Sequence, residues 1–286
     1  MTAHGTQPAP WTPTAPWTRS GRSSSLEAAS TSVSPDRSAV PRPAVCLEQV
    51  TKRYLGDNGI LALDGISLTV RPGEFLTLVG ASGCGKSTLL NLVSGLDKPT
   101  SGSVRVEGQA ALLFQEHALF PWLSALDNVA TPLRLAGMGK KEREARARDY
   151  LGAVHLADFA DRRPHELSGG MKQRVAIART LATRAPVLLM DEPFGALDAM
   201  TRDLLHDELE SIWRELNLTV LFVTHNVREA VRLGDRVVLL SSRPGRIVSE
   251  YDVAIDRPRR IEDRVVSELA GQITDALRAE VARHGA

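Results

Sequence analysis

The chain has 286 residues, and its 35 lysine and arginine residues nearly balance 34 aspartate and glutamate residues, which leaves a formal net charge of +1. A chain of this length folds as one or two domains, and its near neutrality argues against a protein that mainly coats nucleic acid. The hydrophobic fraction of 43% and the charged fraction of 24% are ordinary for a globular protein, and no apolar run approaches the roughly 18 to 20 residues of a membrane span.

The first 43 residues differ in composition from the rest of the chain. Seven of the 16 prolines lie there among Ser, Thr and Ala, and apolar residues show little periodicity. Such a composition buries too little apolar surface to fold, so we predict a disordered, solvated tail at residues 1–43. The first basic residue is Arg19 and no apolar stretch follows it, unlike a signal peptide. Trp11 and Trp17 stand in P-W-T repeats, for which a docking motif is the alternative interpretation.

From Val45 onward, short apolar runs alternate with helical patterns. Runs at 65–70 and 75–79 are typical of strands, and residues 126–150 are predicted to be helical, with the charged run 140–149 as a solvated face. After Leu167, strands are predicted at 187–190, 220–223 and 237–240, with helices at 199–216 and near 227. This alternation predicts an α/β fold with a mostly parallel sheet. A C-terminal stripe at helical spacing predicts one packed helix face: Ile261, Val265, Leu269, Ile273, Leu277 and Val281.

A glycine-rich segment that follows the run 75–79 matches the pattern G-x-x-x-x-G-K-S/T. In this pattern, glycines let backbone N–H groups approach phosphate oxygens, and the N-terminus of the next helix adds positive potential. Lys86 would reach the terminal phosphates, and the hydroxyl of Ser87 would bind Mg²⁺. A glycine-rich turn without a ligand is the alternative. The segment, called the P-loop below, reads Gly80-Ala81-Ser82-Gly83-Cys84-Gly85-Lys86-Ser87-Thr88.

Two further segments are candidate parts of a nucleotide site: one ends in two acidic residues and the other is rich in glycine. The apolar run 187–190 ends in Asp191 and Glu192, and the end of a buried parallel strand is where ligands bind. Asp191 would hold hydrated Mg²⁺, and Glu192 would polarise the water that attacks the γ-phosphate. An ordinary strand end or a helix cap is the alternative. The segment Leu167-Ser168-Gly169-Gly170-Met171-Lys172-Gln173-Arg174, called the signature segment below, is either a nucleotide-facing helix start or a plain capped turn.

The order of the motifs resembles that of the ATP-binding subunit of ATP-binding-cassette (ABC) transporters over about residues 45–260. The motifs in order are the P-loop, Gln115 after a strand, the signature segment, V-L-L-M-D-E-P at 187–193, Ala196-Leu197-Asp198 and Thr224-His225. The resemblance implies an α/β fold with a RecA-like P-loop NTPase core, an antiparallel β subdomain and an inserted helical subdomain at about 119–175. It also implies an ABC ATPase domain at 44–267 and a C-terminal helix at 268–286.

The resemblance further implies the roles of individual residues. Tyr54 would stack on adenine, the P-loop residues 80–88 would bind ATP, and Ser87, Gln115 and Asp191 would hold Mg²⁺. The catalytic group would be Glu192, His225 and Gln115. Without the resemblance, Tyr54 and His225 would be read as ordinary structural residues. Residues that would face the ATP of a second copy are Ser168, Gly169, Gly170 and Asp198, so that two ATP molecules lie in a head-to-tail homodimer.

The implied partners are membrane proteins rather than nucleic acid. ABC importers combine two ATP-binding subunits with two transmembrane permease subunits and an extracytoplasmic solute-binding protein. The expected location is therefore the cytoplasmic face of the cell membrane, as a peripheral subunit. Two cysteines far apart in the sequence, Cys46 and Cys84, fit a reducing cytoplasm.

Four segments resemble the importer group for nitrate, sulfonate, taurine and bicarbonate. They lie at 113–122, with the sequence L-F-P-W, and at 190–202, 225–235 and 257–260. The resemblance is greatest to aliphatic sulfonate import ATPases, with taurine or nitrate and other small anions as alternatives. Asn226 departs from the family because Asp is common after the switch histidine.

Two other functional classes are alternatives to transport. ABC ATPases of translation or DNA maintenance usually carry two cassettes or a long coiled coil, whereas this chain has one P-loop, one L-S-G-G and no long heptad stretch. A regulator that only binds nucleotide is disfavoured because both Glu192 and His225 are retained.

Overall fold

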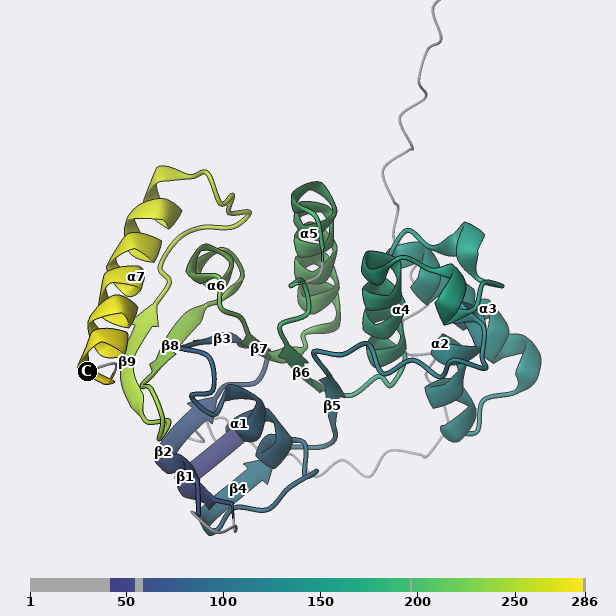
Figure 1. Ribbon diagram of the computed structural model, residues 1–286. Coiled ribbons are helices and arrows are strands. Elements are labelled where there is room, and N and C mark those ends of the chain that lie inside the picture. The colour runs from purple at the N-terminus through teal and green to yellow at the C-terminus, as the bar shows by residue number, and fades with distance from the viewer. Residues whose placement is uncertain (1–41, 55–58, 196, 285–286) are drawn as a thin grey trace, which may run out of the picture. The chain divides into compact units, whose positions relative to one another are not determined.

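The computed structural model describes residues 42–54, 59–195 and 197–284 (Figure 1). The predicted tail, including both P-W-T repeats, lies outside these residues except for its last two positions. Within the described ranges, no helix is long and apolar enough to cross a bilayer.

The central sheet has six strands, and five of them are parallel. In spatial order they are β5 (Ala110–Leu113), β6 (Val187–Asp191), β7 (Thr219–Val223), β3 (Phe75–Val79), β8 (Arg236–Leu240) and β9 (Ile247–Asp252). Only β9 runs antiparallel to its neighbour. Every residue of β3, β6 and β7 is buried, which explains their continuous apolar sequences, because layers cover both faces of a parallel sheet.

A second sheet of three antiparallel strands lies next to the central sheet. Its order is β2 (Leu61–Val70), β1 (Val45–Arg53) and β4 (Ser101–Val106). Helix α1 (Lys86–Val93) packs between the sheets, and Leu89 and Leu90 share one apolar core with Val45, Leu78 and Val238. The opposite face of the central sheet packs against α6 (Val227–Leu233) and α7 (Arg264–His284), as Figure 1 shows.

Three helices inserted between β5 and β6 pack against one another. They are α2 (Ala125–Leu135), α3 (Lys140–Ala153) and α4 (Gly169–Leu181), with short 3₁₀ turns at Ala157–Phe159 and Pro164–Glu166. The helical region predicted at 126–150 is therefore two helices. Gly137 adopts φ of +81° in the connection, a conformation that glycine takes without strain and that ends a helix.

The apolar stripe predicted for the C-terminal helix is wrong at three positions, because Ile261 precedes the helix and Val265 and Val281 are exposed. Helix α7 begins at Arg264 and packs through Val266, Ala270 and Ile273, whereas Val265 and Val281 are 57% and 44% exposed. A helix advances about 100° per residue, so residues spaced strictly by four drift about 40° at each step. A stripe built from such steps turns away from the packed face within a few turns.

The segment after β9 is fastened to the core by two arginines. Arg259 is only 3% exposed, and its guanidinium donates to the backbone carbonyls of Val231 (2.9 Å), Gly234 (2.6 Å), Val253 (3.1 Å) and Ile255 (2.9 Å). Burial lowers the pKa of Arg259 to about 10, so the group stays charged at neutral pH. The second arginine, Arg257, lies over the ring of Trp213 on helix α5 (Ala199–Leu216) at 4.6 Å and forms an ion pair with Asp235 at 2.8 Å.

We expect Arg259→Met to lower the free energy of unfolding by about 3 kcal/mol or more, because several buried carbonyls lose their donor. Urea denaturation measures the change. The matched control is Arg260→Met, at the exposed neighbouring position, which should change stability by less than about 0.5 kcal/mol. Similar small effects of both substitutions would contradict the role assigned to the buried arginine.

Candidate functional site

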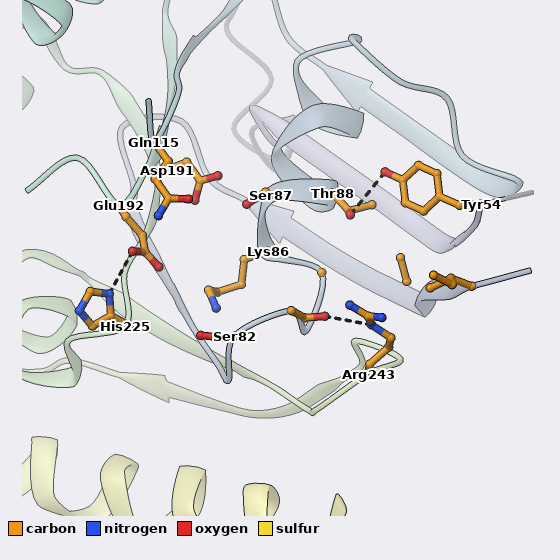
Figure 2. Close-up of a pocket in the computed structure, with 14 residues that line it drawn as sticks. Tyr54, Ser82, Lys86, Ser87, Thr88, Gln115, Asp191, Glu192, His225 and Arg243 are labelled. Carbon is orange, nitrogen blue, oxygen red and sulfur yellow. Dashed lines mark hydrogen bonds and ion pairs between the residues drawn. The ribbon is translucent and has the colours of Figure 1, made fainter. Parts of the chain in front are cut away.

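The carboxyl ends of four neighbouring parallel strands meet at one edge of the central sheet. The P-loop follows β3, Gln115 follows β5, Glu192 follows β6 and His225 follows β7. Loops at such an edge form the ligand site of parallel α/β sheets. Here they enclose a pocket of about 670 Å³, called the strand-end pocket below (Figure 2). It is lined by Tyr54, Ile60, Ala62, Ser82, Gly83, Gly85, Lys86, Ser87, Thr88, Gln115, Asp191, Glu192, His225 and Arg243.

The P-loop has the backbone of a phosphate cradle. Gly85 caps α1 with φ of +103°, and a Cβ there would lie 2.8 Å from the carbonyl oxygen of Ala62, so only glycine fits. The side chain of Lys86 curls back, and its ammonium donates to the carbonyls of Gly80 at 2.9 Å and Ala81 at 3.0 Å. A helix N-terminus beside an ammonium gives this end of the pocket a positive potential that suits phosphate oxygens.

Three P-loop residues support the loop from behind rather than line the pocket. Gly80, Ala81 and Cys84 are absent from the pocket wall, and Cys84 is almost fully buried. Burial raises the pKa of the Cys84 thiol, which therefore stays protonated and inert at neutral pH. A Cβ at Gly80 would lie 2.8 Å from the Cys84 sulfur, so the loop packs tightly here.

Oxygen atoms suited to a divalent cation gather on one side of the pocket. Burial raises the pKa of Asp191, and a hydrogen bond from the Ser87 hydroxyl acts in the opposite direction. Gln115 lies on the same side of the pocket in Figure 2. Among the described residues, no group of three or more His, Cys, Asp and Glu side chains is arranged so that it could hold a metal ion. This donor set fits Mg²⁺, which binds through one or two carboxylates and completes its shell with other oxygens, including those of phosphate and water.

A carboxylate and an imidazole lie beside this oxygen cluster (Figure 2). The Nδ1 atom of His225 is 3.1 Å from Oε2 of Glu192, and their side chains are 66% and 21% exposed. Glu192 has φ of +48°, a left-handed conformation that non-glycine residues adopt mainly at strained functional positions. A carboxylate held by an imidazole can accept a proton from a water molecule.

A buried polar network supports the segment that bears His225. His206 on α5 is fully buried, with Nε2 at 2.8 Å from Glu229 Oε1 and Nδ1 at 2.7 Å from Arg232 Nη1. Because a guanidinium only donates, Nδ1 must accept, and Nε2 carries the proton toward the carboxylate. Glu229 also accepts a hydrogen bond from the hydroxyl of Thr224, the residue before His225. The network therefore fixes the backbone that leads into the histidine.

Asn226, the departure from the family pattern, caps helix α6. Its side-chain oxygen accepts hydrogen bonds from the backbone N–H groups of Arg228 at 3.1 Å and Glu229 at 3.3 Å. Asn and Asp are equally good at this position, so the change leaves the capping interaction intact.

The four residues predicted to act on a second copy do not line the strand-end pocket of their own chain. Ser168 caps α4 and accepts a hydrogen bond from the backbone N–H of Met171 at 3.3 Å, which places Gly169 and Gly170 in the first helical turn. Asp198 caps α5 in the same way, because its side chain accepts a hydrogen bond from the backbone N–H of Thr201 at 3.0 Å.

The loop after Gln115 is tied to the signature helix α4. Nε2 of His117 lies 3.0 Å from the carbonyl oxygen of Gly169. Arg179, farther along α4, donates to the carbonyls of His117 at 3.1 Å and Ala118 at 2.6 Å. A shift of the Gln115 loop would therefore be transmitted to the start of α4.

Sequence reasoning missed three residues of the pocket wall: Ile60, Ala62 and Arg243. Ile60 directly precedes β2, Ala62 is the second residue of that strand, and Tyr54 follows the end of the paired strand β1. Only the pairing of β2 with β1 brings Ile60 and Ala62 to the pocket, so no local pattern in the sequence pointed to them. Arg243 lies in the turn between β8 and β9, and its signal was a basic residue just after a predicted parallel strand.

Comparison with known proteins identifies the family. The family model for the ABC transporter matches residues 63–195. The nitrate import ATP-binding protein NrtD of Synechocystis sp. is 48% identical over 216 residues, which cover 72% of this chain and 81% of that protein. The taurine import ATP-binding protein TauB of Chromobacterium violaceum is 49% identical over 228 residues, which cover 77% and 87%.

A solved structure shows the same fold. The dimeric ATP-binding cassette MJ0796, in a post-hydrolysis state bound to ADP and Pi, matches with a TM-score of 0.69 at 36% sequence identity. The match covers 74% of this chain and all of that one.

The chain belongs to the ABC transporter family and has an ATP-binding domain of the nitrate and taurine import type. The predicted α/β P-loop NTPase fold, with its mostly parallel sheet, antiparallel β subdomain and inserted helices, is confirmed.

Proposed function

We propose that the protein is the ATP-hydrolysing subunit of an ABC importer for small anions, with aliphatic sulfonates as the substrate class. The observation that supports hydrolysis most directly is the pairing of Glu192 with His225 in the pocket that contains the P-loop. A regulator that only binds nucleotide would need the cradle but not this pair.

In the proposed reaction, each part of the pocket has one task. The ring of Tyr54, which is 39% exposed at the pocket wall, stacks on adenine. The ammonium of Lys86 exchanges its two carbonyl partners for phosphate oxygens. Ser87, Gln115 and Asp191 would hold Mg²⁺, which would supply positive charge to the phosphates.

The chemical step is attack by water on the γ-phosphorus. As the new P–O bond forms, the bond to the leaving oxygen of ADP breaks, and the proton of the attacking water passes toward the carboxylate of Glu192. His225 holds that carboxylate and contacts the γ-phosphate. Positioning and charge neutralisation account for most of the acceleration.

A second copy of the chain completes the proposed site. Ser168, Gly169, Gly170 and Asp198 are at helix starts outside the pocket of their own chain, where they can face the ATP of a partner. The solved cassette bound to ADP and Pi is dimeric, which supports the pairing of two copies. ATP binding then closes the dimer and hydrolysis reopens it.

The permease partners would dock beside the Gln115 loop. Phe120 and Trp122 are exposed, with ring centroids 5.6 Å apart, and Leu135 is exposed on the neighbouring helix α2. Phe120 and Leu135 border a shallow apolar cavity of about 240 Å³. An exposed aromatic cluster of this kind is typical of a protein interface. We propose that the subunit sits here on the cytoplasmic face of a membrane, beneath two permease subunits that receive solute from an extracytoplasmic binding protein.

The relatives named above import nitrate and taurine, so taurine or nitrate and other small anions are the alternative substrates. The sulfonate proposal rests on the sequence segments at 113–122, 190–202, 225–235 and 257–260. None of these segments contacts the transported solute in the proposed architecture, so transport assays must decide among the three candidate substrates.

Glu192→Gln should retain ATP binding and lower the rate of ATP hydrolysis by at least about a hundredfold, because an amide cannot accept the proton. Phosphate release and the binding of a fluorescent ATP analogue measure the two properties. The matched control is Glu250→Gln on the exposed edge strand β9, which should hydrolyse ATP at the wild-type rate. Normal hydrolysis by Glu192→Gln would refute its role as the base.

Growth of a deletion strain identifies the substrate. The strain is offered an alkanesulfonate or taurine as sole sulfur source, or nitrate as sole nitrogen source, and is complemented with wild type or Glu192→Gln. We expect loss of alkanesulfonate use alone, restored only by wild type. Selective loss of taurine or nitrate use would replace the substrate and leave the ATPase mechanism intact.

Charged substitutions should separate transport from hydrolysis. We expect the double variant Phe120→Asp, Trp122→Asp to lower solute uptake about tenfold or more, while ATP hydrolysis by the isolated subunit stays within about twofold of wild type. The control is Val248→Asp, at a similarly exposed position on β9 at the other edge of the central sheet. Unchanged uptake in the double variant would place the docking surface elsewhere.

A further inference from the structure

The turn between β8 and β9 has a rigid internal structure. The backbone N–H of Ser241 donates to the carbonyl of Arg246 at 2.8 Å, and the N–H of Arg246 donates to the Ser241 hydroxyl at 2.8 Å. The same hydroxyl donates to the carbonyl of Pro244 at 2.7 Å. These bonds make residues 241–246 a closed turn, called the β8–β9 turn below.

The β8–β9 turn is docked directly on the P-loop. Gly245 donates from its N–H to the carbonyl of Ala62 at 2.9 Å and accepts from the N–H of Asp64 at 3.0 Å. A Cβ on Gly245 would lie 2.3 Å from the carbonyl oxygen of Cys84, so the two backbones touch and no larger residue fits. The position of the turn relative to the phosphate cradle is therefore fixed.

This docking puts one arginine at the pocket wall. Arg243 donates from Nε to the carbonyl of Gly83 at 3.3 Å, and its exposed guanidinium lines the strand-end pocket. Figure 2 shows it on the side of the pocket that holds Tyr54, away from Glu192 and His225.

The charge of Arg243 has no acidic partner among the residues that the structure describes. By contrast, Arg246 of the same turn forms an ion pair with Asp64 at 2.5 Å, and Arg236 of β8 forms one with Glu250 at 2.9 Å. The two Nη groups of Arg243 are thus free to donate to a ligand. A guanidinium presents its donors in a planar fork that matches phosphate oxygens.

We propose that Arg243 is a nucleotide-binding residue that donates to the phosphate nearest the ribose. The proposal rests on the proposed ATPase function and adds one contact to it. Its place beside Gly83, on the adenine side of the P-loop, puts the guanidinium near the end of the triphosphate that ATP and ADP share. Lys86 and the Glu192–His225 pair lie toward the other end. Arg243 therefore strengthens nucleotide binding without taking part in the cleavage step.

The test compares the affinities of fluorescent ATP and ADP analogues for Arg243→Gln, and for Arg246→Gln as the matched control in the same turn. We expect Arg243→Gln to weaken both nucleotides about tenfold or more and by the same factor, as loss of a charge-assisted hydrogen bond does. The KM for ATP should rise by that factor with kcat within about twofold. Arg246→Gln should bind both nucleotides like wild type.

Three results would overturn the proposal. One is wild-type affinity of Arg243→Gln for both nucleotides, and another is weakened binding of ATP alone, which would place the contact at the γ-phosphate. The third is a lower unfolding temperature of nucleotide-free Arg243→Gln that accompanies the loss of affinity, because that would mean a disordered turn rather than a lost contact. Failure of the wild-type chain to bind either nucleotide would instead refute the proposed function.

Discussion

The parallel pairing of β6, β7 and β3 is the constraint on which the site depends. Leu78 of β3 pairs with Val223 of β7, and Val223 also pairs with Asp191 of β6. These pairs bring the starts of three loops to the same level of the sheet, so the P-loop, Glu192 and His225 leave the sheet side by side. A slip of one residue in either pairing would move each side chain of the slipped strand to the opposite face and would shift one loop along the strand direction relative to its neighbours.

A buried polar network next to His225 further fixes the positions of the site residues. His206, Glu229 and Arg232 are all buried, and each makes hydrogen bonds to at least one of the others. Buried charges are tolerated only when they are paired, and Arg232 also forms ion pairs with Asp203 at 3.1 Å and with Asp207 at 2.6 Å. Phe194, two residues after Glu192, packs its ring edge-on against His206 at 4.8 Å. The segments that bear the carboxylate and the imidazole therefore rest on the same buried histidine.

Local sequence patterns identify candidate functional residues that come directly after buried strands. The P-loop was found from its own pattern after an apolar run, whereas Asp191 and Glu192 could equally have been an ordinary strand end until the order of the motifs gave them roles. Local patterns could not predict the order of strands in the sheet, because β3 pairs with two strands that are more than a hundred residues away in the chain. Arg243 was missed for the same reason: its turn meets the P-loop only through tertiary contacts. The error on α7 had a different origin, since spacing by four residues resembles a helix face only over a short distance.

The central claim is that the ATP pocket of one chain is completed by the signature segment of another. The most direct test is the molar mass of Glu192→Gln in solution, measured by light scattering with no nucleotide, with ADP and with ATP. The account predicts that the mass doubles with ATP and not with ADP, because only the γ-phosphate reaches the partner's helix start. A chain that binds ATP tightly yet keeps the mass of a single copy would contradict it.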